Sequence, residues 1–183
     1  SAYVGALGAA LGSMVANLSA HKRGWDERWE EFSDWAEKAK EYHTALLKCV
    51  DEDTDAFNRV MAAFGMPKIS DEEKADRKRA IQDATRNAIE VPFKIMQLAH
   101  DSMDMIEAMA KTGNPNSVTD AGVGALCART AVEGAFLNVK INAGGYENKT
   151  WLAETLEKGA ELLESAKDKE QEILKIVEKK IVE

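Results

Sequence analysis

Four acidic residues lie within the five-residue run 51–55, and one of them interrupts an apolar pattern. The apolar residues Leu46, Val50 and Phe57 follow the spacing of one helix face, and the missing position between Val50 and Phe57 is Asp53. Burial and neighbouring carboxylates both raise the proton affinity of a carboxyl group. We therefore expect Asp53 to face inward and to suit general acid/base chemistry. The alternatives are an aspartate held by a buried Arg or Lys, or one that faces a wet crevice.

Two pairs of polar residues share faces of a later stretch that is rich in Gly and Ala. Asn138 and Asn142 are four residues apart, as are Arg129 and Glu133. An asparagine side chain offers both a donor and an acceptor, which suits the amide-like edge of a heterocycle. Hydrogen bonding between helices is the alternative role for the asparagines. We interpret Arg129 and Glu133 as a structural ion pair.

A short basic cluster stands out in this acidic chain. His21, Lys22 and Arg23 follow the first apolar stretch, and Lys68 follows a second expected helix end. Such residues can bind an anionic substrate tail through charge-assisted hydrogen bonds. The alternative is an ordinary solvated surface.

The cysteines and histidines show no metal-ligand spacing. Cys49 and Cys127 belong to no CxxC motif, and neither His43 nor His100 has a ligand partner three or four residues away. We therefore expect no metal site and no disulfide framework, which fits a protein of the reducing cytoplasm.

Apolar periodicity predicts the helices that must position these residues. Gly65 and Pro67 end a long amphipathic stretch, Ser70 and Glu73 form a capping box, and Pro92 is expected to kink or restart the helix that follows. The expected helices cover residues 2–19, 25–64, 70–111, 117–141 and 150–181, the last with Thr150 as its cap. The sequence thus predicts an all-α, multihelical bundle of about five to six helices, and a single domain over residues 1–183.

Composition supports one folded domain and excludes several classes of partner. The chain has 183 residues, 45% of them hydrophobic, and a formal net charge of −8. An acidic chain is poorly suited to nucleic acid or to an anionic membrane surface, so we expect neither as a partner. Residues 1–20 carry no charge, but twelve of them are Gly, Ala or Ser. This composition favours a closely packed helix over a membrane-spanning one.

Five motifs together carry a resemblance to a known family, and they occur in order along essentially the whole chain. They are the small-residue run 5–15, Val50-Asp51-Glu52-Asp53-Thr54-Asp55-Ala56-Phe57, Pro67-Lys68, the 113–120 loop and Asn138-Val139-Lys140-Ile141-Asn142. The chain resembles the cyclodeaminase/cyclohydrolase family of folate enzymes, which includes the cyclodeaminase part of formiminotransferase-cyclodeaminase.

The resemblance implies a lyase of one-carbon metabolism and histidine degradation. The expected reaction converts 5-formiminotetrahydrofolate to 5,10-methenyltetrahydrofolate and ammonia, with Asp53 as proton shuttle and Asp51 as alternate or orienting acid. This chemistry needs a proton relay and no cofactor. Two alternatives stay open: a methenyltetrahydrofolate cyclohydrolase, or a non-catalytic helical module that binds folate or a partner.

The resemblance also implies how the substrate binds and what the chain assembles with. Residues suited to the pterin ring and its surroundings are Asp120, Asn138, Asn142 and Asn114, while Lys22, Arg23 and Lys68 suit the glutamate tail. We expect a homodimer, and a formiminotransferase as a partner or a fused domain.

Overall fold

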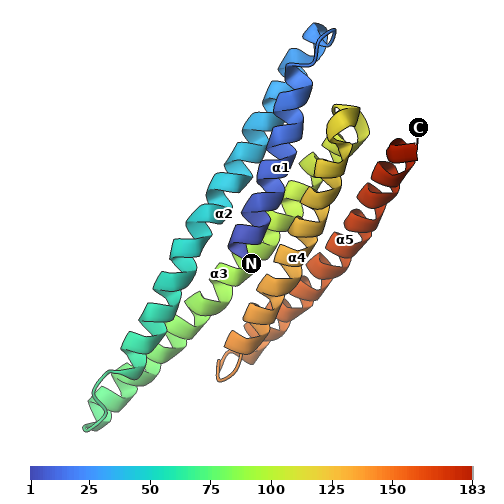
Figure 1. The fold of residues 1–183 in the computed structure, drawn as a ribbon. Coiled ribbons are helices and arrows are strands. Elements are labelled where there is room, and N and C mark those ends of the chain that lie inside the picture. Colours follow the sequence, from blue (N-terminus) through green and yellow to red (C-terminus); the bar gives the residue numbers. More distant parts are fainter. Residues whose placement is uncertain (183) are drawn as a thin grey trace.

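The computed structural model describes residues 1–182, which contain five α-helices and two short 3-10 turns joined by short connections (Figure 1). The 3-10 turns are Asp26–Arg28 and Pro115–Ser117. The helices are α1 (Ala2–Ala20), α2 (Trp29–Phe64), α3 (Asp71–Thr112), α4 (Val118–Asn142) and α5 (Lys149–Val182). The predicted all-α bundle is confirmed, and each predicted helix has a counterpart in it.

The shortest helix lies between two longer ones. Helix α1 packs against both α2 and α4 and also touches α3, while α5 packs on α3 and α4 (Figure 1). The hairpin of α2 and α3 extends well beyond the N-terminal end of α1, which lies about halfway along it (Figure 1). One side of the lower hairpin is therefore not covered by α1.

Small residues allow α1 to approach α4 closely. A Cβ atom on Gly8 would lie 2.8 Å from the backbone oxygen of Gly124, and a Cβ on Gly5 would lie 3.2 Å from Cβ of Ala131. The expected close packing of residues 1–20 is thus confirmed. Among the described residues, α1 is also the one helix whose length and composition alone would permit a membrane crossing, and half of the tested stretch is buried in the bundle.

The helix ends follow local capping chemistry, with one correction. The amide of Glu73 donates to Oγ of Ser70 (3.1 Å) and the amide of Ser70 donates to Oε2 of Glu73 (2.9 Å), so the predicted capping box is confirmed. The predicted cap of α5 at Thr150 is wrong. The Asn148 side chain accepts the amide of Trp151 (3.1 Å), because α5 begins one residue before Thr150.

Helix α3 continues through Pro92 without the restart that the sequence suggested as one outcome. Proline has no amide hydrogen, so the backbone oxygen of Ala88, four residues earlier, loses its normal donor within the helix. The side chain of Asn142 on α4 supplies the replacement, because its Nδ2 donates to the Ala88 oxygen at 2.7 Å. A hydrogen bond between helices thus compensates for the proline.

Candidate functional site

Asp53 lies on the side of α2 that faces α1, but beyond the point where α1 begins. Leu46 lies on that side and is fully buried, with its methyl groups 3.3 Å from the position of a Cβ on Gly5. Asp53 is seven residues further on, about two turns and within about 20° of the same direction. It is nevertheless exposed. The expectation of an inward, buried Asp53 is therefore wrong, although its side of the helix was predicted correctly.

The same side of α2 remains apolar and open as far as the end of the helix. Phe57, Met61 and Phe64 are 63%, 55% and 53% exposed. We call Asp53, Phe57, Met61 and Phe64 the uncovered stripe. The apolar residues do share one side of α2, as the sequence pattern predicted, but no part of residues 1–182 covers the uncovered stripe.

The side of α4 that packs against α1 also continues beyond α1 as an open surface. A Cβ on Gly134 would lie 3.0 Å from Oγ of Ser1, so Gly134 marks the end of the line along which α4 meets α1. Asn138, about one turn further along α4, is exposed, and Ile141, about two turns further, is 75% exposed. Because Asp53 and Asn138 both lie about one turn beyond Ser1, the structure brings them to the two sides of the same open surface.

Basic residues gather where the uncovered stripe ends. Arg77 donates to the backbone oxygen of Phe64 (3.1 Å), and its guanidinium lies 5.7 Å from the centre of the Phe64 ring. Beside it is a hollow of about 320 Å³ whose lining includes Lys68, Lys74, Arg77 and Lys78. We call these four residues the basic hollow. They give the open surface an acidic end near Asp53 and a basic end near Lys68.

Two of the predicted tail-binding residues lie elsewhere. Lys22 and Arg23 precede α2, whereas Lys68 follows it, and the 36 residues of α2 span about 54 Å at 1.5 Å per residue. Within one chain the three residues therefore cannot contact one glutamate together. Lys22 places its ammonium group 3.9 Å from the centre of the Trp25 ring, which is a local contact.

The predicted ring-binding residues are also divided. The donor group of Asn142 is occupied by Ala88, and the Asn114 side chain accepts the amide of Asn116 (3.1 Å) in the turn before α4. Asp120 lies in the first turn of α4, 18 residues and so about 27 Å before Asn138. Of the predicted ring-binding set, Asn138 is the residue that shares the open surface with Asp53.

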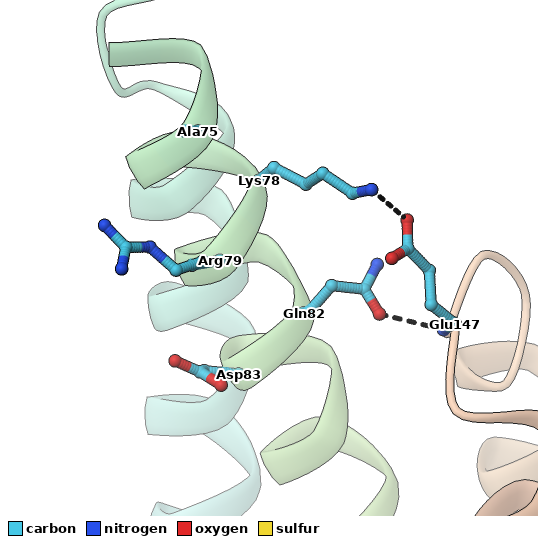
Figure 2. A pocket seen from close by; sticks show the side chains of 6 residues that line it. All are labelled: Ala75, Lys78, Arg79, Gln82, Asp83 and Glu147. Carbon is cyan, nitrogen blue, oxygen red and sulfur yellow. Dashed lines mark hydrogen bonds and ion pairs between the residues drawn. The ribbon is translucent and has the colours of Figure 1, made fainter. Parts of the chain in front are cut away.

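A larger hollow lies on α3 next to the basic hollow (Figure 2). Its volume is about 680 Å³, and Lys78 and Gln82 line both. Gln82 holds the loop between α4 and α5 at two points: its Nε2 donates to the backbone oxygen of Gly145 (3.1 Å), and its Oε1 accepts the amide of Glu147 (2.8 Å). Lys78 adds an ion pair to Glu147 at 2.9 Å (Figure 2). This loop is thereby fixed beside the basic residues.

The acid that points toward α3 is Glu52, which sequence reasoning did not single out. Its carboxylate pairs with Nζ of Lys94 at 2.8 Å, and its side chain is 28% exposed. The hydrogen bond from Lys94 lowers the pKa of Glu52 below its ordinary value of 4.5, so Glu52 is anionic at neutral pH. Lys94 lies 42 residues away on another helix, so no local pattern in the sequence could predict this ion pair.

The interpretation of Arg129 and Glu133 as an ion pair is confirmed. Nη1 of Arg129 lies 2.5 Å from Oε2 of Glu133, and its Nε donates to Glu170 of α5 at 2.7 Å. The arginine therefore ties α4 to α5, a contact with Glu170 that the sequence did not reveal.

Comparisons with known proteins identify one family. A family model described as formiminotransferase-cyclodeaminase matches residues 1–161. A methenyltetrahydrofolate cyclohydrolase from Methylorubrum extorquens is 36% identical over 181 residues, which cover 99% of this chain and 87% of that protein. A formimidoyltransferase-cyclodeaminase from Gallus gallus is 31% identical over 180 residues, but these cover 98% of this chain and only 33% of the relative. This chain thus spans about a third of that relative's length.

A solved structure has a similar fold. The crystal structure of formiminotetrahydrofolate cyclodeaminase from Thermotoga maritima superposes with a TM-score of 0.84 at 27% sequence identity. The match covers 98% of this chain and 86% of that one.

Proposed function

Because the chain belongs to the formiminotransferase-cyclodeaminase family, we propose that it is a folate enzyme acting on the one-carbon unit carried by N5 and N10 of tetrahydrofolate. The observation that supports this most is the open surface with Asp53 at one end and the basic hollow at the other. A folate has the same division, since its reactive ring system and its glutamate carboxylates lie at opposite ends. The ring would lie near Asp53 and Asn138, and the tail near Lys68.

Our first candidate reaction is hydrolysis of 5,10-methenyltetrahydrofolate, as in a cyclohydrolase. Water adds to the methenyl carbon and loses one proton to Asp53. The bond from that carbon to N5 then breaks as N5 takes this proton, and the hydroxyl group loses its own proton to become the formyl carbonyl. The cationic methenyl compound and water thus give 10-formyltetrahydrofolate and one proton. The 36% identity to a protein named methenyltetrahydrofolate cyclohydrolase supports this candidate. The carboxylates Asp51 and Asp53 would also attract the cation.

The second candidate is cyclodeamination, which the sequence resemblance put first. N10 attacks the formimino carbon and loses its proton to Asp53, which returns a proton to the leaving nitrogen as ammonia departs. The neutral substrate and one proton thus give the methenyl cation and ammonia. The names of the Gallus gallus relative and of the Thermotoga maritima structure support this candidate. Neither reaction changes an oxidation state, so we propose that neither needs a redox cofactor.

We also propose a homodimer in which a second copy covers the outer side of α1. Tyr3, Leu7, Met14 and Leu18 are spaced four, seven and four residues apart on that side, and all are exposed. Helix α4, which packs against α1, adds exposed apolar residues that include Leu126. Apolar surfaces of this extent are typical of interfaces between proteins. A formiminotransferase as a partner or fused domain is a further proposal, since the Gallus gallus relative carries that activity in its name.

One pair of assays separates the candidates. The purified chain is supplied with 5,10-methenyltetrahydrofolate or with 5-formiminotetrahydrofolate, and methenyl absorbance and ammonia are followed in both. Loss of the methenyl absorbance faster than in buffer supports the cyclohydrolase. Gain of that absorbance with matching ammonia supports the cyclodeaminase. Folate binding without either change would overturn both and indicate a binding module.

A further inference from the structure

A serine and a histidine meet between α3 and α5, away from the open surface. Nε2 of His100 lies 2.8 Å from Oγ of Ser165, and Nδ1 of the same ring lies 3.3 Å from Oδ1 of Asp101. The His100 side chain is 15% exposed, and Ser165 is half-buried. Both ring nitrogens are thus engaged, one by a hydroxyl and the other by a carboxylate.

The pair lines a hollow of about 440 Å³. Its apolar lining includes Phe93 and Leu162, and its polar lining includes Gln97, Lys158 and Glu161. Helix α5 packs on α3 and α4, so this hollow lies between elements that the proposed folate site does not use together. The site therefore has a nucleophile candidate, space beside it and donors at its edge.

The order carboxylate, imidazole, hydroxyl is the arrangement by which a neutral serine becomes a nucleophile. The imidazole accepts the hydroxyl proton at one nitrogen, while a carboxylate at the other nitrogen orients the ring and favours its protonated form. We propose that Ser165 is the nucleophile of a second catalytic site, which transfers the acyl group of short-chain esters of uncharged alcohols. This proposal rests on the contacts at His100 and is independent of the proposed folate reaction.

The proposed reaction has two balanced steps. Oγ of Ser165 bonds to the acyl carbon while its proton passes to Nε2 of His100; the carbon–oxygen bond of the ester breaks, and the alcohol leaves with that proton. Water then bonds to the acyl carbon, again losing a proton to His100, and the free acid departs as Ser165 regains a proton. Asp101 acts as a positioning residue, because its carboxylate contacts the ring of His100 and takes no part in bonds to the ester.

The lining of the hollow determines which esters fit. Phe93 and Leu162 suit a short aliphatic acyl chain. The ammonium of Lys158 and the amide of Gln97 are the available donors for the negative charge that develops on the carbonyl oxygen. Glu161 disfavours an anionic alcohol, which excludes substrates with carboxylate-rich leaving groups.

The test uses the full chain and p-nitrophenyl butyrate. We expect release of p-nitrophenol and an acyl adduct that peptide mass spectrometry locates on Ser165. Ser165→Ala and His100→Asn should each reduce the rate by about 10²-fold or more, the range expected for loss of a base or nucleophile. Ser33→Ala and His43→Asn are matched controls, since both residues are half-buried on α2, and they should leave the rate unchanged.

The alternative is that the pair merely links α3 to α5, and the same proteins distinguish the two. A linking role predicts lower thermal stability of Ser165→Ala but no acyl adduct on Ser165 in the native chain. Absence of that adduct, or an unchanged rate in a folded Ser165→Ala protein, would overturn the proposal. Asp101→Asn provides a further readout, because a positioning role predicts a lower rate of acylation with the adduct still on Ser165.

Discussion

At the scale of single residues, the direction of a side chain and its burial are separate properties. Asp53 points the way that the apolar pattern predicts, yet it is exposed because no described residue of α1 covers it. Glu52, its neighbour, is partly shielded and ion-paired to Lys94. We therefore assign the proposed chemistry to Asp53 and not to Glu52, because a substrate can reach the exposed carboxylate of Asp53.

Replacement of Asp53 by Asn should remove the proposed proton shuttle. We expect kcat for the folate reaction to fall by about 10²- to 10⁴-fold, the usual contribution of a positioned acid or base. The helical circular dichroism should stay unchanged because the residue is exposed. Asp34→Asn, at another exposed site of α2, is the matched control. Equal rates in the Asp53→Asn and native proteins would contradict the assignment.

The basic hollow should discriminate folates by their tails. We expect Lys68→Ala combined with Lys74→Ala to weaken binding of a polyglutamylated folate by about 10²-fold, because two charge-assisted contacts are lost and each is worth about 1.5 kcal/mol. A monoglutamate should lose less. Lys22→Ala with Arg23→Ala serves as the control and should affect both alike. The measurement is the dissociation constant for each ligand, and equal losses in the Lys68 variant would refute the tail site.

The pair between Glu52 and Lys94 should make stability depend on acid pH. The pKa of Glu52 is lower in the folded chain than its ordinary 4.5. Its contribution is therefore complete above about pH 4.5 and disappears as the pH falls through the folded value. We expect Glu52→Gln to reduce the unfolding free energy by about 0.5–1 kcal/mol at pH 7 and to make little difference in acid. Urea titrations at both pH values measure this, with the exposed Glu157→Gln as control.

At the scale of elements, contacts between helices resolve problems that each helix has alone. Helix α3 contains a proline that would leave the oxygen of Ala88 unpaired, and Asn142 of α4 provides the missing donor. The loop from α4 to α5 is similarly held by Gln82 of α3. Asn142 resembled a ligand-binding group in the sequence, but its side chain, like that of Gln82, is a hydrogen-bond partner of the backbone.

The role of Asn142 can be tested with a double-mutant cycle. Asn142→Ala should lower the unfolding free energy by about 1–3 kcal/mol, the cost of an unpaired buried acceptor. In a Pro92→Ala background the same change should cost less, because the new amide hydrogen at position 92 can serve Ala88. Urea unfolding of the four proteins measures the coupling. An equal cost in both backgrounds would show that the contact does not depend on the proline.

The sequence predicted most of the fold because helices are local. The spacing of apolar residues and the stop at Gly65 located α2, and the capping box at Ser70 located the start of α3. What it could not predict is which helix covers which face. The exposure of Asp53 depends on which part of α2 the described residues of α1 cover, and the use of Asn142 depends on a proline 50 residues earlier, so both require the three-dimensional arrangement.

At the scale of the whole molecule, the described residues leave two apolar surfaces open. One is the uncovered stripe beside Asp53; the other is the outer side of α1, with Leu7 and Met14 exposed. The first leads into the basic hollow and suits a ligand with one anionic end. The second has no such charge and suits another apolar surface. The division indicates separate roles for substrate and for assembly.

The proposed dimer should depend on the outer side of α1. We expect the native chain to have the mass of two chains in multi-angle light scattering, because burial of Leu7 and its neighbours offsets the entropy cost of association. Leu7→Lys with Leu126→Lys should give single chains that remain helical. Ala153→Lys, at an exposed site of α5, should stay dimeric. A native chain with the mass of one copy would contradict the proposal.

The position of Ser1 has a practical consequence for anyone who handles this protein. Ser1 lies against Gly134, about one turn from Asp53 and Asn138, so any residue ahead of Ser1, whether native or from an affinity tag, would leave the bundle beside the proposed substrate surface. The last turn of α5 lies away from that surface, where Nζ of Lys180 donates to the backbone oxygen of Lys111 at 2.6 Å (Figure 1). A purification handle at the C-terminal end is therefore the better choice for kinetic work, and a cleavable N-terminal one should be removed first.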